Sequence, residues 1–373
     1  MLIRVPFAAV TILVFMVVAT MRIVLPDPTR DLFAYQRAVE QAEAGRTMYD
    51  APLSAGPHTP ADGVNLPYVY PPFLAATLSL LPEMEPQVFA RVWMGALFLA
   101  FCGLAACLAR IASGGVTLYR MLSWAIVLAL LSSVTGSLGL GQADVLIWAF
   151  VGLAFAVPGL AGFGLAAAGL LKLYAFWSIA AALFRRDWRT VRWAAATVAS
   201  ALLIGVIALG PVRFASECTT WLLAVFPTLA QGQFETARVA GGIVHWITER
   251  PLPLANLSPT LLPLRALGLG HEVLPGWARV YLLVISIGMP LLVAWQARRW
   301  PVERHYLATL AAALIFAPIC RPAYLITLLP VASMAYRRWR VEAGQRLRDH
   351  ASRSQRPSSR SVGLRPVERI PIR

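Results

Sequence analysis

The chain has little charge and few cysteines for its length, and these shortages exclude several classes of protein. Only 14% of its 373 residues are Asp, Glu, Lys or Arg, whereas soluble domains average about a quarter. The four cysteines show no paired spacing, so neither a disulfide framework nor a zinc site is indicated. There is no DxD motif or His-rich cluster that would bind a metal with a nucleotide sugar, and we expect no metal and no cofactor. With 58% hydrophobic residues, the composition is that of an integral membrane protein.

Apolar runs close to 20 residues long alternate with polar segments, which predicts an all-α polytopic membrane protein. The clearest candidate spans are 5–25, 88–109, 194–209 and 277–295. We interpret the first as a retained helix and not as a cleaved signal peptide. The arginines gather in alternate connections, so the net charge of +15 reflects membrane topology and not a nucleic-acid partner. This distribution places both the N-terminus and the C-terminal tail in the cytoplasm.

Residues 26–87 form the first predicted external loop, because acidic residues outnumber arginines there. The pattern predicts a helix from Asp31 to Gly45, with Leu32, Tyr35 and Ala42 on one apolar side. Such a helix can lie on the membrane surface with this side down. A short interfacial helix, Phe73 to Leu81, is expected after two prolines. Asp31 itself is either a helix cap or a functional carboxylate at the membrane boundary.

Lys172 is the only lysine in the chain, and it lies within an apolar run. If 160–184 crossed the membrane once, four arginines at 185, 186, 189 and 192 would lie on the wrong side. A pair of half-helices with a bend near Lys172 avoids this problem. A lysine in such a place is a functional candidate, but it can also reach the interface or pair with Asp144.

The second half of the chain contains another external loop and a basic tail. Residues 210–276 form this loop, with an interfacial helix expected over 214–229 and His245 further on. Residues 306–336 are predicted to go out and back, with Arg321 at the outer turn as a topology anchor or a phosphate ligand. From Val341 onward, Arg, Ser, Gln and Pro predominate. The sequence therefore predicts a transmembrane domain at 1–340 and a disordered cytoplasmic tail at 341–373, held near anionic lipid.

An interfacial carboxylate with cations nearby is suited to transfer from an anionic lipid carrier. Asp31 would remove a proton from the acceptor hydroxyl, while Lys172 and Arg321 would stabilise the departing phosphate. The main alternative is a lipid or small-molecule transporter or flippase, which the broken helices and intramembrane charge also fit. Against this alternative, the hydropathy pattern has no internal repeat, and the polar residues concentrate in two external loops. A scaffold without chemistry is the third possibility.

Five short motifs, in order, resemble glycosyltransferase family 87 of the GT-C superfamily. They are DLFAYQRAVEQAEAGRTMY with VYPPFLA (31–49 and 69–75), GQADVL (141–146), GLAAAGLLKLYAFW (164–177), NLS (256–258) and APICRPAYLITLLP (317–330). The resemblance covers nearly the whole chain before the tail. It implies a GT-C-like bundle of about ten full or partial membrane helices, with interfacial helices in two external loops at about 26–87 and 210–276.

The resemblance also implies an activity and a set of site residues. Members commonly transfer mannose from a polyprenyl-phosphate carrier at the outer face of the bacterial inner membrane, here to a lipid or glycan acceptor, with inversion. By this resemblance Asp31 is the base, and Lys172, Gln142, Asn256 and Ser258 match further family positions. Tyr35, Tyr68, Tyr70 and His245 are candidates for lining the sugar or acceptor, although the three tyrosines can equally be membrane-interface or packing residues.

The chain departs from the family pattern at several positions. Asp144 and Leu257 stand where Asn and Gln are usual, and Arg321 stands where Trp is common. Ala323 stands where a family histidine lies near the donor phosphate, and this departure matters most. Either Arg321 binds the phosphate instead, or the substrate differs, or the activity is weakened.

Overall fold

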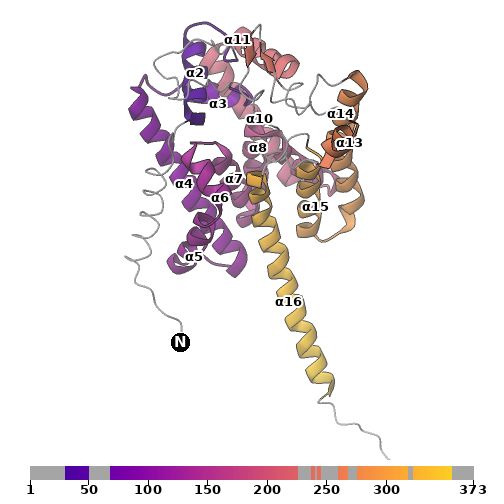
Figure 1. The fold of residues 1–373 in the computed structure, drawn as a ribbon. Coiled ribbons are helices and arrows are strands. Elements are labelled where there is room, and N and C mark those ends of the chain that lie inside the picture. Colours follow the sequence, from indigo (N-terminus) through magenta and orange to yellow (C-terminus); the bar gives the residue numbers. More distant parts are fainter. Residues whose placement is uncertain are drawn as a thin grey trace, which may run out of the picture. The chain divides into compact units, whose positions relative to one another are not determined.

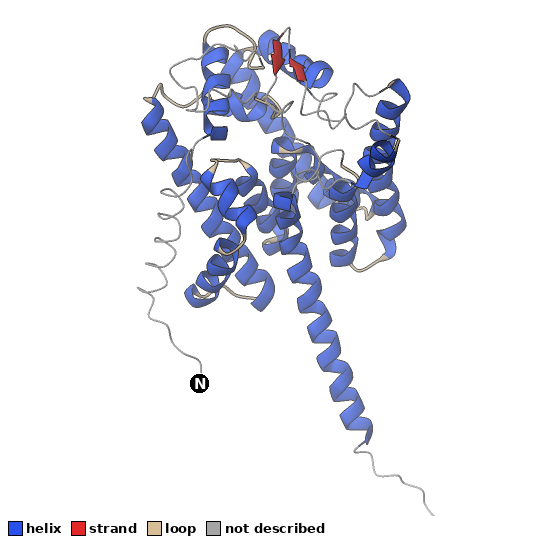
Figure 2. Ribbon diagram, in the orientation of Figure 1, coloured by secondary structure: helices blue, strands red, loops and turns tan. Residues whose placement is uncertain are grey.

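The computed structural model describes residues 30–49, 68–225, 237–239, 242–244, 259–267, 275–317 and 322–354. This part of the chain is helical, apart from one antiparallel hairpin of strands β1 (Ala237–Val239) and β2 (Gly242–Val244) (Figure 2). Ala237 pairs with Val244, and Val239 pairs with Gly242. The helices confirm the all-α membrane class that the composition predicted.

Three helices in the described residues are long and apolar enough to cross a membrane: α4 (Pro86–Ser113), α10 (Trp188–Leu209) and α14 (Gly276–Gln296). Their exposed surface is apolar; for example, Leu99 on α4 is 72% exposed and Leu203 on α10 is 60% exposed. Outward-facing side chains of this kind indicate contact with lipid. A fourth crossing is counted if α5 (Leu118–Ala129) and α6 (Ser132–Gly139) form one span. These two helices are bent by 83° relative to each other.

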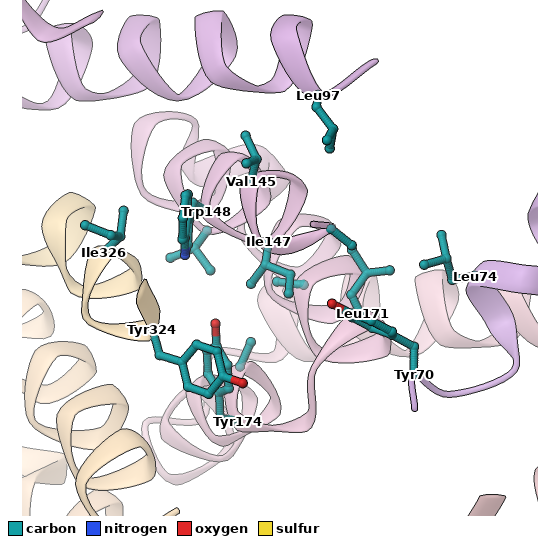
Figure 3. Packing of buried hydrophobic residues seen from close by; sticks show 14 of the residues in the cluster. Tyr70, Leu74, Leu97, Val145, Ile147, Trp148, Leu171, Tyr174, Tyr324 and Ile326 are labelled. Atoms are coloured by element: carbon teal, nitrogen blue, oxygen red, sulfur yellow. The ribbon is translucent and has the colours of Figure 1, made fainter. Parts of the chain in front are cut away.

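The core of the bundle is a row of packed helices: α4 packs on α7 (Asp144–Ala156), α7 on α8 (Ala161–Leu171), and α8 on α10 (Figure 1). α7 is apolar on all sides, as a helix enclosed by neighbours must be. Its residues Ile147 and Trp148 are fully buried, with Ile326 nearby (Figure 3). Glycine permits the close approach between α7 and α8, since a Cβ on Gly164 would lie 2.4 Å from the Phe150 carbonyl oxygen.

The break predicted near Lys172 is confirmed. After the turn η1 (Pro158–Leu160), α8 ends at Leu171, and Lys172 has an extended backbone with φ −144° and ψ 122°. The chain then re-forms as η2 (Leu173–Phe176) and α9 (Trp177–Phe184). Two short helices therefore replace the single crossing of 160–184. The side of the membrane to which they open stays a prediction.

The segment before α4 contains the predicted helix, but the environment of that helix differs from our expectation. α2 runs from Arg30 to Glu43, and Gly45 has a positive φ of 78° just beyond its end. Its apolar side does not face a membrane surface, because Leu32, Ala38 and Ala42 are buried inside the protein. The short helix α3 (Phe73–Leu78) and α4 residues occupy that side instead. The expected surface helix is therefore a core element.

The remaining elements complete two compact units, one up to Ala335 and one from Tyr336 onward. The first unit also contains α11 (Pro211–Thr220), the π-helical turn η3 (Trp221–Val225), η4 (Pro259–Leu261), α13 (Leu262–Ala266), η5 (Ala297–Arg299), α15 (Val302–Ile315) and η6 (Pro322–Leu328). α16 runs from Leu329 to Ser354, so the prediction of a disordered tail from Val341 onward is wrong for residues 341–354. Helix-forming residues and the Arg338–Glu342 ion pair, four residues apart, favour this helix.

The close approach of α7 and α8 leads to a stability prediction. In Gly164→Ala the new methyl group meets backbone that cannot move alone, so we expect a loss of about 1–3 kcal/mol. Gly103→Ala on α4 is the matched control, because nothing lies within 4 Å of its Cβ position and alanine favours a helix. Thermal unfolding of both variants in detergent measures the effect. Equal melting temperatures would show that the helices can separate without cost.

Candidate functional site

The turn between α6 and α7 carries the GQAD sequence and is tightly fixed. Gly141 has a positive φ of 70°, a conformation that favours glycine, and its carbonyl accepts a 2.8 Å hydrogen bond from the Trp93 indole. The backbone N–H of Gln142 donates to the Ser137 carbonyl, and the Ser137 hydroxyl donates to Gln142 Oε1 at 3.2 Å. The turn therefore holds the Gln142 side chain in one place, beside the start of α7.

The first turn of α2 lies against this GQAD turn. A Cβ on Gly141 would be 3.5 Å from Leu32 Cβ, and the Tyr35 hydroxyl accepts a 3.1 Å hydrogen bond from the Ala143 N–H. Asp31 immediately precedes Leu32 in α2, so its backbone is close to the turn. The Asp31 side chain lies outside the described part of the structure. Two motifs that are more than 100 residues apart in sequence are therefore neighbours in the fold.

Lys172 forms an ion pair with Asp144, with 2.5 Å between Nζ and Oδ1. The two residues stand at equal distances of 14 residues on either side of Pro158, so the α7–α8 hairpin brings them to the same end. Asp144 lies in the first turn of α7 and Lys172 directly follows α8, and each charge has the sign that stabilises its helix terminus. The Asp144 side chain is 3% exposed and that of Lys172 19%. Of the two structural alternatives for Lys172, reaching the interface or pairing with Asp144, the pair is the one present in the structure.

Aromatic rings surround the ammonium group. Lys172 Nζ lies 4.2 Å from the centre of the Tyr324 ring and 5.7 Å from that of Tyr70, and both are cation–π contacts. Tyr324 comes from η6, and its ring lies against Tyr174 with centroids 5.6 Å apart (Figure 3). The Tyr174 hydroxyl shares a 3.0 Å hydrogen bond with Thr327. The segment after Arg321 therefore contributes to the Lys172 site through Tyr324.

The VYPP segment is held by two tyrosines. The Tyr68 hydroxyl donates to the Pro71 carbonyl and accepts from the Ala75 N–H, and the Tyr49 hydroxyl donates to the Tyr70 carbonyl at 3.1 Å. Burial raises the pKa of Tyr49 and of Tyr68, so both phenols keep the proton that they donate. Tyr35 and Tyr68 are 1% and 3% exposed. Tyr35 and Tyr68 therefore pack inside the protein, whereas the Tyr70 ring faces Lys172; a contact of any of the three with a sugar stays a prediction.

A buried carboxylate, Glu217 on α11, joins the segment that follows α10 to the end of α2. It is 4% exposed and accepts hydrogen bonds from the Thr47 hydroxyl at 3.0 Å and the Met48 N–H at 3.2 Å. Nearby, Arg213 donates to the carbonyls of Gln41 and Arg46, and the Trp221 indole donates to the Val69 carbonyl. These bonds hold the end of α2 and the segment around Val69, and both of these parts of the chain support Tyr70. We refer to Arg213 and Glu217 of α11, together with Trp221 at the start of η3, as the α11 clamp.

The sequence reasoning missed the α11 clamp, Tyr324 and Trp93. The available signal for Glu217 was a lone carboxylate within an otherwise amphipathic stretch, and the signal for Tyr324 was its place in the RPAY motif. Four expected site residues, Arg321, His245, Asn256 and Ser258, lie outside the described residues, and their roles stay predictions. Among the residues that are described, no group of three His, Cys, Asp or Glu side chains is placed to hold a metal ion.

The ion pair predicts an asymmetry between its two partners. Lys172→Met leaves the Asp144 carboxylate buried without its cation, which we expect to destabilise the protein by about 3 kcal/mol. Asp144→Asn keeps the shape of the side chain, and Lys172 retains the Tyr324 ring and partial exposure, so the loss should be smaller. Denaturant unfolding in detergent compares the two variants. An equal or reversed order would contradict this account of the pair.

Glu217 predicts a dependence of stability on pH. Burial raises the pKa of its carboxyl above the ordinary 4.5, and the bonds from Thr47 and Met48 with the charge of Arg213 lower it in part. The folded protein therefore binds this proton more tightly than the unfolded chain does. Its stabilising contribution is present below pH 4.5 and is lost as the pH rises through the raised pKa.

Glu217→Gln removes this titration and keeps an acceptor oxygen. As the pH rises from about 4 to about 8, we expect the wild type to lose unfolding free energy relative to the variant. Melting temperatures measured across this range test the expectation. Parallel profiles for the two proteins would show that the pKa of Glu217 is not raised.

Comparison with known protein families supplies an independent finding. The profile of Glycosyltransferase family 87 matches residues 68–327, which is more than half of the chain. The matched range contains the GQAD turn, Lys172 and Tyr324, whereas α2 with Asp31 precedes it. No curated protein and no solved structure gives a match.

Proposed function

Because this chain belongs to glycosyltransferase family 87 and is therefore a membrane glycosyltransferase, we propose that it moves a hexose from a polyprenyl-phosphate carrier to a lipid or glycan acceptor. Mannose is the proposed sugar. The reaction takes place at the outer face of a bacterial inner membrane, with both chain termini in the cytoplasm. The proposed fold is a GT-C-like bundle of about ten full or partial membrane helices, and no metal or cofactor takes part.

The observation that carries this proposal is the placement of Lys172 and Asp144 at a break between membrane-type helices, beside the first turn of α2. Irregular backbone among apolar helices is tolerated where protein or a water-filled cavity surrounds it, and such places commonly bind polar substrate groups. Here the break joins an ammonium group, aromatic rings and the GQAD turn. The same place receives α2, which carries Asp31.

The donor requires an apolar surface for its polyprenyl chain and cations for its phosphate. Large apolar side chains exposed on α4, α10 and α14 provide the apolar surface for the polyprenyl chain. We assign the phosphate to Lys172 and Arg321, with the amide nitrogen of Gln142 as a hydrogen-bond donor. Tyr70, His245, Asn256 and Ser258 are assigned to the sugar or the acceptor. Of these four, Tyr70 is the one within the part of the chain that the structure describes, and its ring centre lies 5.7 Å from Lys172 Nζ.

The proposed chemistry is a single displacement. The acceptor hydroxyl attacks the anomeric carbon and its proton passes to the Asp31 carboxylate, while the bond from that carbon to the phosphate oxygen breaks and the configuration inverts. Polyprenyl phosphate leaves with the bonding electron pair, and the cations stabilise its charge. A phosphate is a good leaving group, so no general acid is needed. The transport alternative explains the broken helices as well, but family membership favours transfer.

Asp31→Asn tests the base. We expect transfer from radiolabelled polyprenyl-phosphate-mannose to a total lipid extract to fall at least about 100-fold, because the amide cannot accept the proton. Glu43→Gln is the matched control, since it removes an exposed carboxylate from the same helix and should keep full activity. A fully active Asp31→Asn protein would exclude Asp31 as the base. If the wild type uses only a donor with another hexose, the assignment of mannose is wrong.

A further inference from the structure

The ammonium group that the proposed donor phosphate would use already has an anionic partner. Lys172 and Asp144 are in contact at 2.5 Å, so together they present almost no net charge to an incoming anion. A phosphate next to the closed pair would be attracted by one group and repelled by the other at nearly the same distance. Tight binding of the phosphate therefore requires the pair to open.

The surroundings of the pair favour movement of the lysine over movement of the carboxylate. The Asp144 side chain is 3% exposed and lies in the first turn of the buried helix α7, whereas the Lys172 side chain is 19% exposed and sits in extended backbone. The Tyr324 ring, 4.2 Å away, stabilises the ammonium group without a carboxylate. An anion thus approaches from the lysine side, and Asp144 stays in place.

Opening the pair leaves Asp144 as a buried carboxylate that has lost its cation. Such a group is costly unless hydrogen-bond donors replace the lost partner. A sugar attached to the phosphate carries hydroxyl groups, which donate hydrogen bonds to carboxylates, whereas a bare polyprenyl phosphate carries none at that position. The loaded carrier can therefore satisfy both halves of the opened pair, and the spent carrier can satisfy only one.

We propose that Asp144 is a specificity-determining residue that makes the site prefer the sugar-loaded carrier to the spent one. With the loaded donor, Lys172 contacts the phosphate and the Asp144 carboxylate accepts hydrogen bonds from the sugar hydroxyls. After transfer the hydroxyls are gone, so Lys172 returns to Asp144 and the polyprenyl phosphate is released. This inference rests on the proposed function and adds to it a means of avoiding product inhibition.

The test compares the affinities of the full-length protein for polyprenyl-phosphate-mannose and for polyprenyl phosphate, measured in nanodiscs without acceptor. In the wild type we expect the loaded carrier to bind about tenfold more tightly, as a charged hydrogen bond implies. In Asp144→Asn we expect the bare carrier to gain affinity and this preference to shrink severalfold. If Asp144 acted only in folding, the substitution would weaken the binding of both carriers equally and leave the ratio of the two affinities unchanged.

Glu342→Gln is the control for net charge, because it removes one carboxylate from an exposed ion pair in the C-terminal unit. Its affinity ratio should equal that of the wild type. Equal affinities for the two carriers in the wild type would overturn the inference without any variant, as would an unchanged ratio in a folded Asp144→Asn protein. Failure of every protein to bind either carrier would instead overturn the proposed function together with the inference.

Discussion

The ion pair between Lys172 and Asp144 is the constraint on which the arrangement of the site depends. It closes the open end of the α7–α8 hairpin, where α7 gives way to the GQAD turn and α8 gives way to an extended residue. α2 packs on that turn through Tyr35, and η6 reaches the ammonium through Tyr324. A charge pair in this place compensates the dipoles of two helix termini. Four parts of the chain that are distant in sequence, α2, α7, α8 and η6, meet around it.

The support of the site lies outside the membrane-type helices. The α11 clamp holds the end of α2 and the segment around Val69, and these in turn hold Tyr49 and Tyr70. Tyr70 then lies over the Lys172 ammonium. A series of individually modest polar bonds thus connects α11 to the ion pair. The segment around α2 and the segment around α11 therefore act together as one support for the predicted transferase site.

The sequence allowed the break at Lys172 to be predicted, because four arginines made a single crossing costly and the lone lysine marked the bend. It also offered Asp144, in the turn before the neighbouring apolar run, as a possible partner. The apolar side of α2 was assigned to lipid instead, because helical periodicity cannot distinguish a membrane surface from a protein core. Glu217 was missed because its hydrogen bonds come from the Thr47 hydroxyl and the Met48 backbone N–H. Neither of these groups leaves a recognisable pattern in the sequence. The tail was misjudged because its composition hid the helix-forming residues up to Ser354.

The α11 clamp also has a consequence for biosynthesis. Thr47 and Glu217 are 170 residues apart in the chain, so the end of α2 lacks its partner until α11 has been made. At about 5–20 residues per second, this delay lasts roughly ten to thirty seconds. During that time the end of α2 lacks the hydrogen bonds that Glu217 and Arg213 supply. The order of synthesis therefore makes the second loop the element that completes the first.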